Sequence, residues 1–193
     1  NSSGVPLAVI YIKWLTLAII DLMLLLTVPI AAPVVAAIYR AQPHGLPSYS
    51  WGWLWGTYDN PPQGDEGYIR KRAPFPGLIT GWQGYVNRVM WMIRNPCYGF
   101  ARWTALDYIA DQVQRVIGKD GISDKDKVPG WYFVRLYRKG KLAGFEFYGV
   151  FPWSETRNLR VRLGWKILTD KFQRNGFAQL VNTVNPFDGY GDK

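Results

Sequence analysis

The sequence predicts an α+β fold: an N-terminal transmembrane-like helix followed by a small domain with two amphipathic helices and a three-stranded antiparallel meander. The first observation is a run of eighteen uncharged and mostly apolar residues from position 22 to 39. The second is a set of apolar residues at helical spacing in the middle of the chain, and the third is alternation of apolar and polar residues after position 130. We expect a hydrophobic helix over 1–40, a Trp-rich and acidic linker over 41–77, and a basic α+β domain over 78–193.

The hydrophobic segment has the length and composition of a membrane-spanning helix. A helix in the core of a soluble protein keeps a polar stripe, whereas Leu, Ile, Val and Ala occupy every face here. Pro29 and Pro33 each remove a helical hydrogen bond, so we expect a kink near them. A cleavable signal peptide is the main alternative, with "VAA" before Ile38 as its cleavage site, but the apolar core of a signal peptide is shorter.

Lys13 and Asp21 are the charged residues of this helix before Arg40. They are eight positions apart and therefore lie within about 80° of each other on a helix. One interpretation is an ion pair that faces a partner helix, because a carboxylate inside a membrane is costly unless protein or water surrounds it. The other is that Lys13 extends to the membrane surface while Asp21 is protonated or hydrated. The sequence leaves both open.

Three tryptophans, Trp51, Trp53 and Trp55, occupy every second position shortly after the helix. In an extended segment they would share one face. Tryptophan is enriched where a membrane meets water, so they predict an aromatic collar that contacts lipid or a neighbouring subunit. The alternative is that this face packs on the soluble domain.

A loop with three acidic residues follows the tryptophans. Asp59, Asp65 and Glu66 could ligate a hard cation such as Ca²⁺ or Mg²⁺. Their spacing matches no standard cation loop, so we favour a solvated turn and predict no metal site.

Cysteine and histidine are too scarce for most enzyme chemistry. The chain has one cysteine, Cys97, and one histidine, His44, which excludes an intramolecular disulfide and a thiolate zinc site within one chain. There is no phosphate-binding glycine loop, GxSxG motif or zinc signature. We therefore predict that the protein is not an enzyme and carries no cofactor.

Two amphipathic helices are expected after the linker. The first covers residues 78–94 and ends at Asn95-Pro96. The second begins with Thr104 as N-cap and reaches Gly118. Its expected apolar face consists of Leu106, Ile109, Ala110, Val113 and Ile117, with Asp107 and Asp111 in the first two turns.

The second half of the chain predicts strands. Residues 131–138 and 142–151 form a hairpin around the turn Lys139-Gly140-Lys141, and residues 158–168 form a third strand. In the third strand Leu159, Val161 and Leu163 alternate with Arg160 and Arg162, which predicts a sheet with one wet, basic face. A short strand or an extended tail is expected at the C-terminus.

The basic residues are candidates for binding polyanions. The formal net charge is +9 and the sequence pI is about 9.7, which favours nucleic acid, anionic lipid or an acidic protein face as partner. The best candidates are Arg70, Lys71 and Arg72, next to the aromatic residues Tyr68 and Phe75, and Arg160 and Arg162 on the third strand. The alternative is a solvated or ion-paired face inside an oligomer.

Four short motifs carry a family resemblance: "WGWLWGTYDN…GDEG", "VMWMIRNPCYGFAR", "GWKI" and "NTVNPF". With them the chain resembles small tailed-bacteriophage proteins of unknown function that combine a Trp/Asp/Gly element, a Trp-rich helix ending in "RNP" and a "GWK" strand. The resemblance covers about 120 residues. It implies a phage origin and no mechanism.

Together these observations predict a non-enzymatic phage protein that is virion-associated and oligomeric, contacts other structural subunits, and uses its apolar helix on a lipid bilayer during assembly or genome delivery. The first alternative is a protein made in the infected cell that is anchored in the inner membrane of the host and binds a host or phage partner. The second is a basic DNA-contacting subunit of an oligomer.

Overall fold

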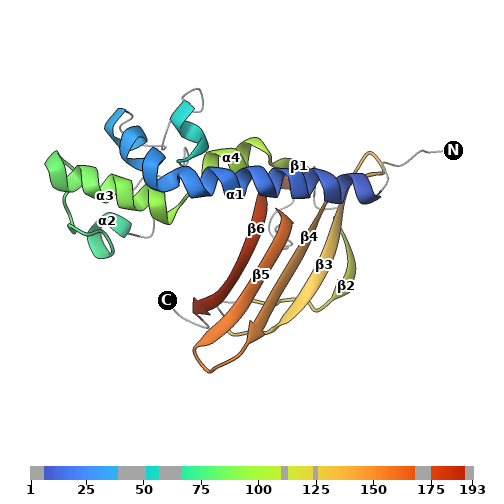
Figure 1. The fold of residues 1–193 in the computed structure, drawn as a ribbon. Coiled ribbons are helices and arrows are strands. Elements are labelled where there is room, and N and C mark those ends of the chain that lie inside the picture. Colours follow the sequence, from blue (N-terminus) through green and yellow to red (C-terminus); the bar gives the residue numbers. More distant parts are fainter. Residues whose placement is uncertain are drawn as a thin grey trace. The chain divides into compact units, whose positions relative to one another are not determined.

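The computed structural model describes residues 7–38, 51–56, 67–109, 113–123, 126–167 and 175–189 (Figure 1). Contacts divide the chain into two compact units. The first, which we call the sheet unit, combines Asn1–Ala18 with Thr104–Lys193, and the second, the helical unit, is Ile19–Trp103. The long N-terminal helix begins in the sheet unit and ends in the helical unit.

Helix α1 (Leu7–Ile38) confirms the predicted apolar helix and contains both Pro29 and Pro33. Its last turns run in a different direction from the rest, in the part of the helix that carries the two prolines (Figure 1). Within the described residues α1 is the one helix that is long and apolar enough to cross a membrane, over Ala8–Ile38. Length and composition alone do not distinguish it from a core helix or a signal sequence.

The sheet unit contains an antiparallel sheet of six strands among the described residues, in the order β1-β6-β5-β4-β3-β2. The α+β class and the antiparallel sheet are confirmed. The predicted meander is β3 to β5, and the sheet extends beyond it on both sides. The strands are β1 (Leu106–Ile109), β2 (Val113–Gly118), β3 (Gly130–Arg138), β4 (Lys141–Pro152), β5 (Arg157–Lys166) and β6 (Asn175–Gly189).

The predicted helix from Thr104 to Gly118 is wrong, because this segment supplies β1 and β2. Its apolar residues satisfy a helical period, but those in β2 are mainly β-branched and favour strands. Strand pairing decides the outcome: β1 pairs with β6 from the far end of the chain, and β2 pairs with β3, the strand that follows it. Ala110 and Asp111 lie outside the described residues.

Strand β6 is longer than the short strand or tail that the sequence predicts. It has 15 residues and pairs with β5 from Arg157↔Gly189 to Lys166↔Gln179. Its first residues pair with β1. Strand β5 is therefore an interior strand, with hydrogen-bonded neighbours on both sides.

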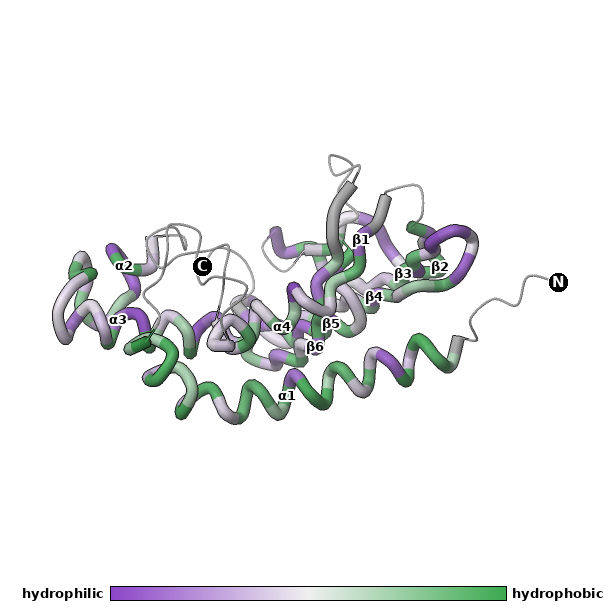
Figure 2. The backbone as a smooth tube through the Cα atoms, turned by 90° about the horizontal axis from the view of Figure 1, so that it is seen from above, coloured by the Kyte–Doolittle hydropathy of each residue, from purple (hydrophilic) through white to green (hydrophobic). Residues whose placement is uncertain are grey.

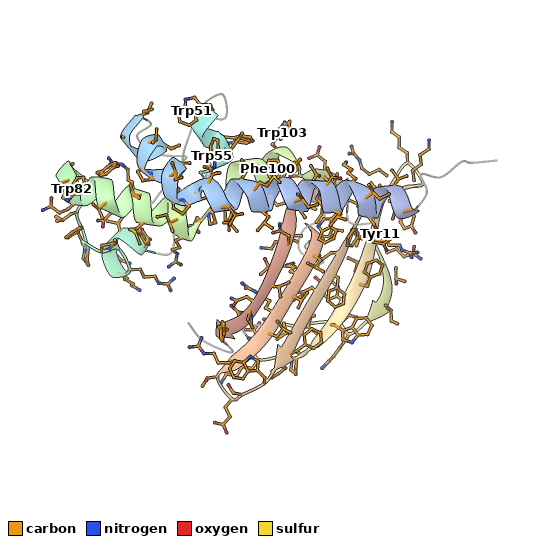
Figure 3. All side chains as sticks on the ribbon, viewed as in Figure 1. Tyr11, Trp51, Trp55, Trp82, Phe100 and Trp103 are labelled. Carbon is orange, nitrogen blue, oxygen red and sulfur yellow. The ribbon has the colours of Figure 1, made fainter. Side chains whose placement is uncertain are left out.

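The first turns of α1 pack on one face of the sheet. The ring of Tyr11 lies 4.7 Å from that of Phe145, and the ring of Trp14 lies 5.6 Å from it (Figure 3). The indole of Trp14 also donates a hydrogen bond of 3.2 Å to the carbonyl of Val181. These contacts bury Phe145 together with Trp165. The N-terminal part of α1 is therefore an integral part of the sheet unit.

The helical unit consists of the rest of α1, the 3₁₀ helix η1 (Trp51–Leu54) and the helices α2 (Tyr68–Lys71), α3 (Gly81–Arg94) and α4 (Tyr98–Trp103). Helix α3 confirms the first predicted amphipathic helix. The buried side chain of Asn87 fixes the preceding loop to it, because its Nδ2 donates to the carbonyls of Phe75 and Leu78, both at 2.7 Å. Its Oδ1 accepts from the backbone N–H of Phe75 at 3.0 Å.

Candidate functional site

The largest candidate interaction surface is α1 itself. Figure 2 shows hydrophobic residues along most of its length. A single stripe of α1 faces the protein, with Val28, Ala32, Val35 and Ala36 as its most buried members. The other sides expose large apolar side chains from the first turn to the last, such as Leu26 at 72% exposure. The exposed set is Val9, Ile12, Leu15, Ile19, Ile20, Leu22, Met23, Leu25, Leu26, Ile30, Val34 and Ile38.

The two charged residues of α1 have different surroundings. Lys13 belongs to the sheet unit, where its Nζ lies 5.7 Å from the ring centroid of Trp165, a cation–π contact. Asp21 belongs to the helical unit and is half-buried there. The ion-pair interpretation stays a prediction.

The three tryptophans do not form an extended segment, because the residues around them fold into η1. The expected shared face is therefore absent: Trp51 is exposed while Trp53 and Trp55 are half-buried. The rings of Trp51 and Trp55 still meet edge to face at 6.0 Å. The indole of Trp55 donates a hydrogen bond of 2.7 Å to the hydroxyl of Thr27 on α1. Trp55 thus fixes η1 to the apolar helix.

Helix α3 exposes its apolar side. Trp82, Met90 and Ile93 are all exposed, Trp82 at 69%, and Val86 and Val89 on the same side are half-buried. The opposite side carries the buried residues Gly84, Asn87 and Trp91. The sequence shows that α3 is amphipathic, but it does not show which side the protein covers.

The predicted basic cluster lies on and directly after α2. Arg70 and Lys71 are in the helix, Arg72 is its C-cap, and all three are exposed. Helix α2 is close to α3, because the guanidinium of Arg94 lies 5.9 Å from the ring centroid of Tyr68. The hydroxyl of Tyr68 also donates a hydrogen bond of 3.2 Å to the carbonyl of Asn87. Helix α2 therefore packs against the side of α3 that carries Asn87, and the basic cluster belongs to the same unit as the exposed apolar side of α3.

The two arginines of β5 are paired within the chain. Arg162 donates a short hydrogen bond to the carboxylate of Glu146, and Arg160 forms an ion pair of 3.6 Å with Asp188. Glu146 and Asp188 are both buried, as are Tyr132, Val134 and Val150 on the same sheet face. The expectation of a wet, basic face is thus wrong, because β4 and β6 supply carboxylates that neutralise the arginines, and neighbouring residues of this face are buried.

Glu146 is the centre of a buried polar cluster. Its second carboxylate oxygen accepts the backbone N–H of Ile167 at 2.8 Å, and the guanidinium of Arg162 lies 4.7 Å from the ring centroid of Tyr148. Burial raises the pKa of Glu146, whereas Arg162 and the N–H of Ile167 act in the opposite direction. Burial and the neighbouring Glu146 raise the pKa of Tyr132, so its hydroxyl stays protonated. The cluster therefore links β3, β4 and β5 to one another.

The sheet face that carries α1 continues as an apolar surface beyond the helix. The strand register places Phe133, Phe147 and Leu163 in one row and Trp131 and Val161 in the next. All the large apolar residues of these rows are exposed or half-buried, in contrast to Phe145 and Trp165 under α1. The exposed and half-buried apolar residues of this surface are Ile117, Trp131, Phe133, Phe147, Phe151, Leu159, Val161, Leu163 and Val184.

Cys97 is buried between η1 and α4. Burial, together with the nearby Asp21 carboxylate, raises the pKa of its thiol from 9.0 to about 12. Because the folded pKa is the higher one, the stabilisation from keeping the thiol neutral is complete below pH 9 and is lost as the pH rises toward 12.

We expect Cys97 in the native protein to resist alkylation at pH 8. Its thiolate fraction should be about a thousand-fold below that of an ordinary cysteine, and burial adds a steric barrier. Iodoacetamide labelling measured by mass spectrometry tests this, with urea-unfolded protein as the positive control. Rapid labelling of folded protein would contradict the burial.

Other residues of interest give no further site. His44 and the acidic loop residues Asp59, Asp65 and Glu66 lie outside the described residues. Within the part of the chain that the structure describes, no cluster of three His, Cys, Asp or Glu side chains could hold a metal ion. The candidate sites among the described residues are therefore the exposed apolar surfaces and the basic cluster on α2.

The fold and these surfaces define an α+β protein with a long apolar N-terminal helix and an antiparallel sheet. Residues 6–192 match a protein family of unknown function, DUF7338. The chain therefore belongs to this family. No curated protein and no solved structure matches the chain.

Proposed function

We propose that the protein is a non-enzymatic, membrane-associating structural protein of a phage particle, which uses α1 to enter or contact a bilayer during assembly or genome delivery. The observation that carries the proposal is the exposure of twelve large apolar side chains along α1. Covering them is worth on the order of 1 kcal/mol each, or about 10 kcal/mol in total. That sum is comparable to the whole stability of an ordinary domain, so lipid or neighbouring subunits cover the helix.

The phage assignment rests on the resemblance of the four sequence motifs to small tailed-phage proteins. The apolar rows of the sheet unit support contacts with other subunits in the particle, because an exposed apolar area of this kind marks an interaction surface. The ion pairs of Arg160 and Arg162 weaken the DNA-contacting alternative, because both cations are neutralised within the chain.

Membrane association can be tested with charges on the exposed side of α1. Lysine at Met23 and Leu26 costs about 2.5–3.5 kcal/mol each near a bilayer centre, whereas in water both exposed positions tolerate it. We expect the native chain to remain with bacterial membranes after alkaline carbonate washing, and Met23→Lys/Leu26→Lys to move to the supernatant. The matched control Ser154→Lys/Thr156→Lys adds the same charge in the exposed β4–β5 turn and should remain in the pellet.

A detergent-free native chain that sediments as a soluble monomer would refute this proposal. Mass spectrometry of purified particles tests the virion assignment separately. A chain found in membranes of infected cells and absent from particles would instead fit the alternative of an inner-membrane protein that binds a host or phage partner.

A further inference from the structure

A second membrane contact follows from the way α3 is packed. We propose that α3 is an interfacial helix: its exposed apolar side enters the outer layer of an anionic bilayer, and basic residues of the helical unit bind the lipid phosphates. This inference rests on the proposed membrane association and adds a contact site, in a different part of the chain from the exposed stretch of α1.

The apolar residues on the exposed side of α3 form a continuous stripe. At 100° per residue, Trp82, Val86, Val89, Met90 and Ile93 fall within about 100° of the helix circumference. Trp82, labelled at the end of α3 in Figure 3, is 69% exposed, and its ring centroid lies 5.3 Å from that of Tyr85. Phe75, Leu78 and Ile79, in the loop before α3, are exposed as well. An amphipathic helix with tryptophan and long aliphatic residues on one face is typical of helices that lie in a membrane surface.

The packing of α3 prevents this stripe from turning inward. A Cβ atom on Gly84 would lie 2.2 Å from the carbonyl carbon of Ile79, so the loop packs directly against the helix backbone at this point. On the same side Asn87 forms its three hydrogen bonds to the loop, and Trp91 is 2% exposed. Rotating α3 to bury Trp82 would break all of these contacts. The apolar stripe is therefore held outward by the fold.

Charge identifies the partner as an anionic surface. Residues 67–103 contain six basic residues and no acidic one. Arg70 and Lys71 on α2 are exposed, and so is Arg94 near the C-terminus of α3. Anionic lipid headgroups attract each such residue by about 1 kcal/mol, and the apolar layer beneath the headgroups accepts the stripe. A bilayer that contains phosphatidylglycerol provides both, so we assign the stripe to lipid rather than to a protein groove.

A nitroxide label at Met90→Cys tests the position of α3 in the full chain bound to vesicles. Buried Cys97 should stay unlabelled, which the native chain checks, and Ser154→Cys in the exposed β4–β5 turn is the matched control. In vesicles of phosphatidylcholine and phosphatidylglycerol we expect the Met90 label to lose collisions with a water-soluble nickel chelate several-fold and to gain collisions with oxygen. The Ser154 label should remain accessible to the chelate.

The outcomes separate this inference from the proposed function. A vesicle-bound chain that resists carbonate but keeps its Met90 label in water would refute the role of α3 and leave that of α1 intact. A chain that does not bind vesicles would refute both. Spin–spin broadening between Met90 labels without lipid would identify a second copy as the partner and refute the lipid assignment.

Removing charge tests the headgroup contact. In the Met23→Lys/Leu26→Lys background, where insertion of α1 is weakened, we expect residual binding to depend on phosphatidylglycerol. Arg70→Gln/Lys71→Gln should weaken this residual vesicle binding roughly thirty-fold, at about five-fold per charge removed. The control Lys139→Gln/Lys141→Gln removes two charges from the exposed β3–β4 turn and should change it little. Equal binding to vesicles of pure phosphatidylcholine would overturn the assignment to anionic lipid.

Discussion

Replacing Glu146 with alanine is expected to reduce the free energy of unfolding of the sheet unit by about 3–5 kcal/mol. The variant removes the carboxylate that neutralises Arg162 and leaves that guanidinium, only 18% exposed, without its counter-ion. It also removes the acceptor for the backbone N–H of Ile167. A buried charge and a buried donor without partners are both costly. Urea unfolding followed by near-UV circular dichroism in detergent measures the loss.

Two further variants separate the ionic contribution from simple loss of volume. Glu146→Leu/Arg162→Leu removes both charges, so it should recover most of the stability lost in the single variant, because replacing a whole buried ion pair by apolar residues is often close to neutral. Glu155→Ala, in the exposed β4–β5 turn, should change stability by less than about 0.5 kcal/mol. A loss below about 1 kcal/mol for Glu146→Ala would show that Arg162 does not depend on this carboxylate.

The Glu146 pair also illustrates what sequence alone could reveal. Alternation along β5 correctly placed Arg160 and Arg162 on one face, but the nature of that face depends on its neighbours. One signal was available: Glu146 is the single charged residue of β4 after Lys141, on the same side as Tyr148. Since β4 and β5 are consecutive antiparallel strands, Glu146 could have been suspected as the partner of an arginine in β5.

The elements that could be predicted are those with a strong local pattern. Helix α1 is apolar on every face over 32 residues, and helix α3 and strands β3 to β5 each have a periodic pattern over nine residues or more. Strand β1 has four residues and pairs with β6, about seventy positions later in the chain, so its conformation is decided by a distant partner. The tryptophans of η1 alternate over only five positions. Such short patterns fit several conformations, and tertiary contacts choose between them.

Surface assignments are harder to predict than elements. The spacing of Trp82, Val86 and Ile93 predicts a helix with an apolar side, and this helix is observed. Periodicity does not reveal whether the rest of the protein covers that side. In α3 the covered side is the one that carries Gly84 and Asn87, because these residues hold the preceding loop against it. Small and amide residues at helical spacing are a weak signal, although they can mark the packed side of a helix when the apolar side serves an interface.

Replacing Gly99 with alanine is expected to disrupt the helical unit, at a cost of about 3 kcal/mol. A Cβ atom at this position would lie 1.7 Å from the carbonyl oxygen of Trp53 and 2.6 Å from its carbonyl carbon. Both are backbone atoms, so no side-chain rotation relieves the overlap. The Gly99 N–H also donates a hydrogen bond of 2.8 Å to the carbonyl of Gly56, which ties α4 to the end of η1. The methyl group therefore forces the two elements apart.

This separation should be visible at Cys97, because its backbone N–H donates to the carbonyl of Trp55 in the same contact. We expect Gly99→Ala to lower the melting temperature and to make Cys97 reactive toward iodoacetamide under conditions that leave the native chain unlabelled. The control is Gly77→Ala, whose added Cβ meets nothing within 4 Å and whose φ of +79° costs only about 1–2 kcal/mol. Because Gly77 is distant in sequence from η1, its variant should leave Cys97 protected.

If Gly99→Ala left both the melting temperature and the labelling unchanged, η1 and α4 would not be in contact.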